Sequence, residues 1–185
     1  NAGGNVDSDF LAVWDGIHWN NLGTAALNNA VFDIAINGKD VVIVGYFLDA
    51  GGLPGADHFA RWNGSGWQPI SAEYTGNYET IAISGDDIFV GGLFSNLDGI
   101  DEADNIARWH LTWAPYQYTW QALSQGVNGD IYAIAVDGLD VYIGGSFTTV
   151  NGVSGTQYIA RWDGSTWHAL GSGLPGFVYT IAING

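Results

Sequence analysis

The side chains best suited to chemistry in this sequence recur at matched positions along the chain. Three arginines each stand directly before a tryptophan, and three aspartates each begin an apolar run upstream of them: Arg61, Arg108 and Arg161, with Asp40, Asp87 and Asp140. A buried guanidinium needs a partner, and carboxylate or carbonyl oxygens pair with it well. The recurrence predicts a structural Arg–Asp or Arg–carbonyl bridge in each repeat, because catalysis would require one copy to differ from the others.

One copy of the repeat carries a short aromatic insertion, H-L-T-W-A-P-Y-Q-Y-T-W, which contains Trp113, Pro115, Tyr116 and Tyr118. Aromatic rings on a protruding, proline-stiffened loop can stack on a sugar ring or anchor a protein partner. We therefore take Trp113, Tyr116 and Tyr118 as candidate ligand-binding residues. The alternative is an extended hairpin that buries its own aromatic rings against a neighbouring sheet.

The densest acidic run is L-D-G-I-D-E-A-D-N, which supplies Asp98, Asp101, Glu102 and Asp104. Hard oxygen ligands at short spacing suit Ca²⁺, although the run does not follow the EF-hand pattern. The four residues are candidate calcium ligands, with a solvated acidic rim as the alternative, and no other cofactor is expected. The four histidines share no position in the repeat, so a zinc site is not expected either.

Sequence patterns typical of enzyme sites do not occur in this chain. There is no cysteine, and no serine lies in a G-x-S-x-G context that would make it a nucleophile. Asn63, followed by Gly and Ser, matches a glycosylation acceptor, but Asn-Gly is also the chemistry of a tight hairpin turn. We expect a protein that is not an enzyme, and we leave both interpretations of Asn63 open.

The charge balance excludes one large class of partner. Four Lys and Arg residues face nineteen Asp and Glu residues, which gives a formal net charge of −15. Binding to a phosphate backbone needs clustered cations that displace its counterions, so a nucleic-acid partner is not expected. Nor does any run reach the ~18 apolar residues that span a bilayer, so membrane insertion is not expected.

The elements that must position these residues come from an internal repeat. Trp14, Trp62, Trp109 and Trp162 recur at intervals of 47 to 53 residues, and a second tryptophan follows each of them. Each unit reads as four short strands, such as residues 132–136, 141–147, 159–162 and 167–170, joined by Asn-Gly and Asp-Gly turns. A repeating four-stranded unit of this length predicts an all-β fold, a β-propeller of four-stranded antiparallel blades, with the tryptophans as buried anchors.

The two ends of the chain fall out of phase with the blades. We expect one propeller segment over residues 1–185. Residues 1–22 end one blade, residues 23–69, 70–122 and 123–170 form three blades, and residues 171–185 supply the first strand of the next. We therefore expect one of two arrangements: either the parent chain continues beyond these residues, or neighbouring chains complete the open sheets into a ring or filament, since open sheet edges pair readily with another chain.

The unit V-Y-I-G-G-S-F, followed by Y-I-A-R-W-D-G-S-T-W, resembles the kelch and galactose-oxidase type of propeller. It is most similar to the repeat of secreted bacterial propellers, called the delta-sixty repeat, and to the fungal cortical cell-polarity marker propeller. The resemblance covers nearly all of the chain and implies an extracellular or cell-surface location. The copper and radical chemistry of galactose oxidase is not implied, because it needs a cysteine.

Together these observations favour a non-enzymatic extracellular repeat module that serves adhesion, surface display or structural assembly. Its expected partners are proteins, including a second copy of this chain through open sheet edges. The alternative is a carbohydrate-binding propeller that uses the aromatic insertion to hold glycans. Loop lengths place either kind of recognition on the side of the blades where the long, variable connections emerge.

Overall fold

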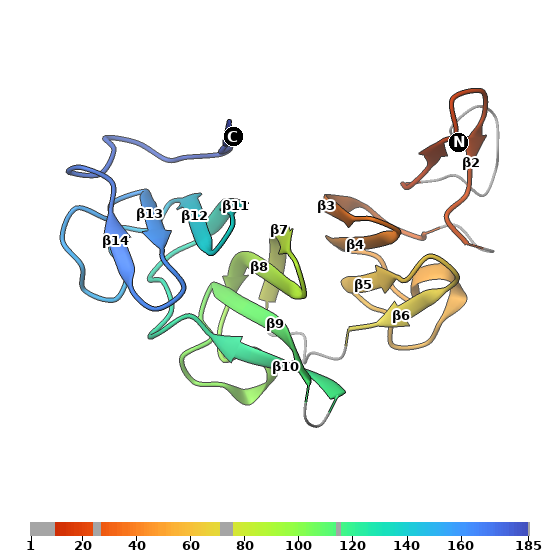
Figure 1. Ribbon diagram of the computed structural model, residues 1–185, viewed down its shortest axis with the longest axis horizontal. Helices are drawn as coiled ribbons and strands as arrows, with labels where there is room; N and C mark the ends of the chain where they lie inside the picture. Colours follow the sequence, from red (N-terminus) through yellow and green to blue (C-terminus); the bar gives the residue numbers. More distant parts are fainter. Residues whose placement is uncertain (1–9, 24–26, 71–75, 114–115, 185) are drawn as a thin grey trace. The chain divides into compact units, whose positions relative to one another are not determined.

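The protein has an all-β fold of three four-stranded antiparallel sheets and one two-stranded sheet (Figure 1). The computed structural model describes residues 10–23, 27–70, 76–113 and 116–184, with the side chains of residues 111–117 outside that description. The predicted fold of four-stranded antiparallel propeller blades is confirmed. The chain divides into two compact units, Asn1–Ser71 and Ala72–Gly185, which are taken in turn.

The first unit holds the two-stranded sheet and one blade. The small sheet pairs β1 (Val13–Trp14) with β2 (Trp19–Asn20). The blade runs in chain order through β3 (Val31–Asn37), β4 (Asp40–Gly45), β5 (Phe59–Trp62) and β6 (Trp67–Pro69), with the short 3₁₀ helix η2 (Ala50–Gly52) between β4 and β5.

The second unit holds two blades of the same topology. One contains β7 (Gly76–Ser84), β8 (Asp87–Phe94), β9 (Ile106–Trp113) and β10 (Tyr116–Ala122), with η3 (Leu97–Gly99) between β8 and β9. The other contains β11 (Ile131–Asp137), β12 (Asp140–Gly145), β13 (Ile159–Trp162) and β14 (Trp167–Ala169). No helix among the described residues is long and apolar enough to cross a bilayer.

Two-residue turns close the first hairpin of every blade. Asn37 pairs with Asp40, Ser84 with Asp87, and Asp137 with Asp140, so two residues remain in each turn. The first turn residue is a glycine with positive φ: Gly38 at 61°, Gly85 at 58° and Gly138 at 60°. Glycine adopts this conformation without strain, which is why a glycine directly after Asn37, Ser84 and Asp137 fixes the strand register here.

Within the second unit the two blades pack face to face, because β11 lies against β7 and β8. Gly91 on β8 faces Ile131, so a Cβ added at Gly91 would lie 2.7 Å from Cγ2 of Ile131. Ile131 and Ile134 are 0% and 9% exposed, and they belong to a continuous apolar cluster with Phe89 and Ile143. Burying each such side chain stabilises the fold by about 1.5–3 kcal/mol. Strand pairing and blade stacking therefore form one core.

The paired tryptophans are not all buried. Trp67, Trp120 and Trp167 are buried, and the first tryptophan of each of these blades is partly buried. The expectation that Trp14 is a buried anchor is wrong, since Trp14 is 51% exposed and Trp19 is 45% exposed. The physical reason is that β1 and β2 form a sheet of only two strands among the described residues, so their outward face has no cover.

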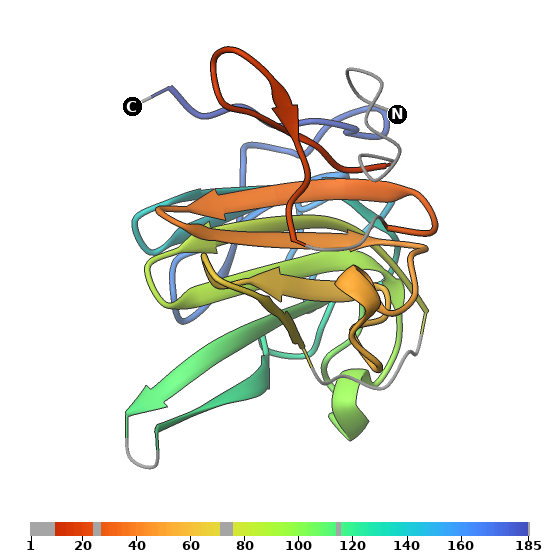
Figure 2. The same ribbon diagram turned by 90° about the vertical axis from the view of Figure 1, so that its right-hand side faces the viewer.

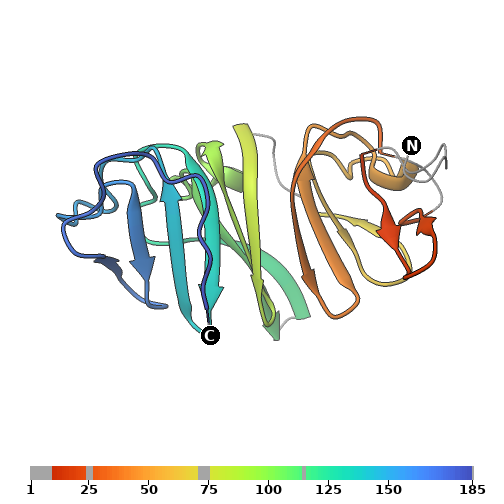
Figure 3. The ribbon, with the colours of Figure 1, turned by 90° about the horizontal axis from the view of Figure 1, so that it is seen from above.

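Residues 171–184, expected to supply the first strand of a further blade, form no strand in the structure. They nevertheless run alongside β11 and β12 (Figure 3). The backbone N–H of Val178 donates to the carbonyl of Gly145 at 3.3 Å, and Tyr179 stacks on Tyr132 with ring centroids 5.2 Å apart. Residues 177–184 thus pack where a first strand would, without a second strand of their own sheet among the described residues.

Candidate functional site

The recurring arginines and aspartates form ion pairs across neighbouring strands. Arg61 pairs with Asp40, and Arg161 Nη1 lies 2.8 Å from Asp140 Oδ2. Asp140 raises the pKa of Arg161, chiefly by accepting its hydrogen bond. These ion pairs join β5 to β4 and β13 to β12, so each of them links two neighbouring strands of its blade.

The aromatic-insertion copy changes this pattern. Asp87 pairs with the imidazole of His110, while Arg108 donates to the side chain of Gln121 and has Nη1 3.5 Å from Asp87 Oδ2. The carboxylate is therefore shared between two cations when His110 is protonated. The sequence shows only that His110 occupies a position where the other blades carry no histidine; the structure adds that His110 faces Asp87 across β8 and β9.

The aromatic insertion forms the end of the β9–β10 hairpin, which projects beyond the other strands of its sheet (Figure 2). Tyr118 stacks on Trp109 with ring centroids 4.0 Å apart and planes inclined by 13°. Trp120 lies next to Trp109 at 6.4 Å. Trp113 pairs with Tyr116 in the backbone register, and the side chains of both residues lie outside the described part of the structure.

The acidic loop between β8 and β9 is held by a hydrogen bond to its own backbone, because Asp104 Oδ1 accepts from the backbone N–H of Asn96 at 2.9 Å. The corresponding loop of the first unit has the same bond, in which Asp57 Oδ1 accepts from the backbone N–H of Asp49 at 2.6 Å. The other candidate calcium ligands are exposed: Asp98, Asp101 and Glu102. Within the described residues no three Asp, Glu or His side chains gather closely enough to hold a metal ion, so the structure does not bring these four carboxylates together.

Asn63 occupies the turn between β5 and β6 and is used as a turn residue. Its Oδ1 accepts from the backbone N–H groups of Ser65 and Gly66, each at 3.0 Å. Asp163 holds the equivalent turn between β13 and β14. The N–H of Thr166, and then the His168 side chain, hold the pKa of Asp163 far below its usual range. The turn chemistry of Asn63 is therefore present, and its glycosylation stays a prediction.

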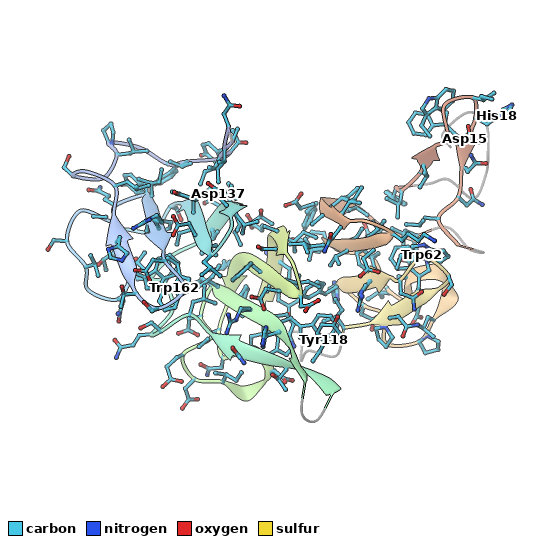
Figure 4. The ribbon with its side chains drawn as sticks, in the orientation of Figure 1. Asp15, His18, Trp62, Tyr118, Asp137 and Trp162 are labelled. Carbon is cyan, nitrogen blue, oxygen red and sulfur yellow. The ribbon has the colours of Figure 1, made fainter. Side chains whose placement is uncertain are left out.

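Two shallow hollows open on the described surface. One of about 370 Å³ lies at the loop end of the second unit, lined by Leu93, Phe94, Ser95, Asp104, Asn105, Val127 and Asn128. The other, of about 230 Å³, lies beside Trp62 and Trp67 in the first unit, where Figure 4 labels Trp62. Asn105 is committed to structure in the first hollow, because its amide donates to the carbonyl of Val127 at 2.6 Å.

Sequence reasoning missed an acidic pair near the inner strands of the second unit. Burial raises the pKa of Glu79 on β7, and the negative charge of Asp130 raises it further. The Tyr132 hydroxyl donates to Asp130 at 3.4 Å. One signal could have revealed the pair: Glu79 occupies a repeat position that is aromatic in the other copies, as Phe32, Tyr132 and Tyr179.

The β1–β2 sheet has the backbone signature of the outer half of a blade. Phe10, which precedes it, has φ of 63°, and the same position in the three blades also has positive φ: His58 at 59°, Asn105 at 61° and Tyr158 at 66°. Such values are unusual for residues with bulky side chains. Their recurrence shows that residues 10–20 keep the conformation of the third and fourth strands of a blade.

An apolar face lies open on the blade of the first unit. Ile34 and Ile36 on β3 are 44% and 67% exposed, whereas Ile134, in the position of Ile34, is 9% exposed. Among the described residues β1 pairs only with β2, and β3 only with β4. Within the described part of the chain nothing covers the half-blade or this face of β3, and we call the two together the open half-blade: residues 10–20 and the face of β3 that carries Ile34 and Ile36.

No protein-family model matches the sequence, and no curated protein matches it. Among solved structures, the chain is similar to the computationally designed Ika4 protein, a designed propeller, with a TM-score of 0.53. The match covers 85% of this chain and 82% of that chain at 13% sequence identity. A likeness at this identity concerns the fold alone.

Proposed function

We propose that this protein is a non-enzymatic extracellular repeat module whose open sheets serve structural assembly, adhesion or surface display. The observation that carries the proposal is the open half-blade, where an apolar strand face is exposed although its counterpart in the second unit is buried. Exposed apolar faces and unpaired strand edges are surfaces at which chains associate.

The polar side chains of the repeat support the same function, because they bond to other groups within their own blades and loops. The cations of the repeat are paired with carboxylates or amides inside the blades, and Asp57, Asn63 and Asp104 bind backbone N–H groups of their own loops. The repeat's resemblance to kelch, delta-sixty and cortical-marker propellers supports an extracellular or cell-surface location. Proteins are the proposed partners, including further copies of the chain.

Sedimentation velocity over a range of protein concentrations tests the assembly function. We expect species larger than the monomer whose fraction rises with concentration. Ile36→Asp should shift the distribution toward the monomer, because it places a charge on the open apolar face. A compact monomer at every concentration, with no binding to cell-surface material, would contradict the proposal.

Carbohydrate binding is the second candidate function, and the Tyr118–Trp109 stack on a projecting hairpin favours it. Stacked aromatic rings form a flat platform that suits the apolar face of a sugar. A glycan array tests it: binding should disappear in Trp113→Ala and in Tyr116→Ala. Trp14→Ala is the matched control, because Trp14 is an exposed tryptophan in the other unit. Equal loss in all three variants would argue against a site on the hairpin.

A further inference from the structure

We propose that the hollow at the loop end of the second unit is a binding site for an arginine side chain of a protein partner. This hollow, of about 370 Å³, lies between the β8–β9 loop and the connection from β10 to β11. The inference rests on the proposed function, in which proteins are the partners, and it names one site and the side chain that the site recognises.

The hollow exists because one repeat position carries a small side chain in this blade. Asn105 stands where the other copies carry an aromatic ring, and all four residues have positive φ: Phe10, His58, Asn105 and Tyr158. In the last blade the ring of Tyr158 packs edge-on against Phe177, with ring centroids 5.3 Å apart. Asparagine leaves open in this blade a space that a ring takes in the last one.

Three hydrogen bonds hold the walls of the hollow in place. The Asn105 amide donates to the carbonyl of Val127 at 2.6 Å, and the N–H of Val127 donates in return to the carbonyl of Asp104 at 3.1 Å. Asn105 Oδ1 also accepts from the N–H of Phe94 at 3.1 Å. The two segments that line the hollow are therefore tied to each other, and a site formed in advance loses less conformational entropy when a ligand binds.

The lining combines an apolar wall with separate hydrogen-bond acceptors. Leu93 is 50% exposed and offers apolar surface that the methylene stem of an arginine can cover. Of the described lining residues only Asp104 is charged, and only its Oδ1 accepts a hydrogen bond from the described part of the chain. The hydroxyl of Ser95 is a second acceptor on the lining. A forked guanidinium reaches separate acceptors at once, whereas an ammonium group is a point charge.

The charges around the hollow favour a cation. Three further carboxylates of the same loop are exposed: Asp98, Asp101 and Glu102. The sequence of the second unit contains two Lys or Arg residues, Arg108 and Arg161, and each of them is bonded to side chains of its own blade. Neither arginine balances the acidic loop, so the loop attracts a cation from outside.

Negative charge lies on the inner side of the hollow as well. Leu93 pairs with Asn77, which is two residues before Glu79, and the lining residue Asn128 is two residues before Asp130. Burial raises the pKa of Glu79, and the charge of Asp130 raises it further. Carboxylates that disfavour each other's ionisation are stabilised by a cation nearby, so both sides of the hollow favour an arginine.

An NMR titration of the intact chain with Nα-acetyl-arginine methylamide tests the site. The backbone amide signals of Asn105, Val127 and Asn128 should shift and saturate, whereas those of Ser65 and Gly66, at the hollow of the first unit, should stay in place. The citrulline analogue has nearly the same shape without the charge and should produce no shifts. Shifts that spread over the acidic surface without saturating, or tighter binding of the lysine analogue, would overturn the assignment.

Two variants in one loop separate this site from general attraction between charges. Asp104→Asn should weaken binding about tenfold or more, because it removes a charge-assisted hydrogen bond but keeps an Oδ1 that can accept from Asn96. Asp101→Asn is the matched control: it removes the same charge, but Asp101 does not line the hollow, so the affinity should change by less than about twofold. Equal losses in the two variants would show that the hollow is not the site.

Asn105→Tyr tests the origin of the hollow. The new ring should fill the space as Tyr158 does in the last blade, and binding should disappear while circular dichroism and melting match the natural chain. Binding that survives in such a folded variant would contradict the site. If the variant melts far below the natural chain, the comparison of Asp104→Asn with Asp101→Asn decides.

The results also separate this site from the proposed function. If the arginine analogue does not bind while the chain assembles with itself or attaches to cell-surface material, the arginine site is wrong and the proposed function stands. If the analogue binds as described while the chain remains a monomer and attaches to no cell-surface material, the arginine site stands and the proposed function is wrong.

Discussion

Trp167 donates its indole N–H to the backbone carbonyl of Leu123, at 3.0 Å, across the junction between the two blades of the second unit. The bond is buried, and Trp167 is 4% exposed. The same bond links Trp67 to Leu22 in the first unit. The second tryptophan of the repeat thus does more than fill the core, because its N–H satisfies a carbonyl where one blade ends and the next begins.

Trp167→Phe should remove this bond while keeping an aromatic ring. We expect a loss of about 1–3 kcal/mol in the free energy of unfolding, because the Leu123 carbonyl is left buried without its partner. Urea denaturation followed by circular dichroism measures it. Trp162→Phe is the control and should cost less, since Trp162 is only partly buried. Equal losses in the two variants would show that ring size, and not the hydrogen bond, sets the stability.

Gly91→Ala should destabilise the contact between the two blades of the second unit. The new Cβ would lie 2.7 Å from Ile131, which forces side chains or backbone to move at a cost of about 1–3 kcal/mol. Gly66→Ala is the matched control: Gly66 has no atom within 4 Å of an added Cβ and no positive φ. Combining Gly91→Ala with Ile131→Ala, which removes the Cγ2 atom that the new Cβ would meet, should cost less than the sum of the two single losses, and strict additivity in this cycle would contradict the contact.

The regular part of the fold could be predicted from the sequence because its determinants are local. The Asn-Gly and Asp-Gly turns set the hairpins, and the expected strand over residues 159–162 coincides with β13 (Ile159–Trp162). The tryptophan spacing predicted the repeat, but spacing alone does not show whether other strands cover a given tryptophan. Trp14 has the same sequence neighbours as a buried anchor and is exposed, because burial depends on strands that lie elsewhere in space.

Glu79→Gln should make stability less dependent on pH. Because the folded-state pKa of Glu79 is raised above its ordinary value of 4.5, the folded protein binds this proton more tightly than the unfolded chain. Stability contributed by the proton is present below pH 4.5 and is lost as the pH rises through the folded pKa. The variant should therefore be more stable than the natural protein at neutral pH, with the difference reduced below pH 4.5. Thermal melting at a series of pH values measures this, and a variant that is less stable at neutral pH would refute it.

Asp163→Asn should lower the stability of the fold at neutral pH, whereas Glu79→Gln should raise it. The pKa of Asp163 is lowered from 3.8 by hydrogen bonds from the Thr166 N–H and the His168 side chain. Its contribution to stability is complete above pH 3.8 and is lost as the pH falls through the folded pKa. The variant should be less stable than the natural protein at neutral pH, and the two should converge in strong acid.

Asn63 provides the control for Asp163, because it occupies the corresponding turn between β5 and β6. Asn63 holds the equivalent turn with an amide oxygen that accepts from Ser65 and Gly66, so the asparagine side chain is compatible with the turn. Asn63→Asp should then gain stability at neutral pH if a carboxylate strengthens these bonds. Urea denaturation midpoints at neutral pH and below pH 3.8 measure the stability of both variants. If the difference in midpoint between the Asp163→Asn variant and the natural protein is the same at the two pH values, the lowered pKa of Asp163 does not stabilise the fold.

The candidate sites were harder to predict than the fold because they depend on single departures from the repeat. His110 shares Asp87 with the expected arginine, Arg108, and Glu79 brings a carboxylate to an aromatic position beside Asp130. Asn105 replaces the aromatic ring of the other copies. Each departure is visible in the sequence, but its consequence depends on which groups face it across a sheet or between blades.

The central claim is that successive blades stack through a second strand that carries glycine against a first strand that carries isoleucine. Nuclear Overhauser effects in the intact protein test it most directly. The account predicts cross-peaks from the Gly91 α-protons to the methyl groups of Ile131 and Ile134, and from Gly144 to Val178. Cross-peaks within each sheet but none between Gly91 and these isoleucines would show that the blades do not stack in this way.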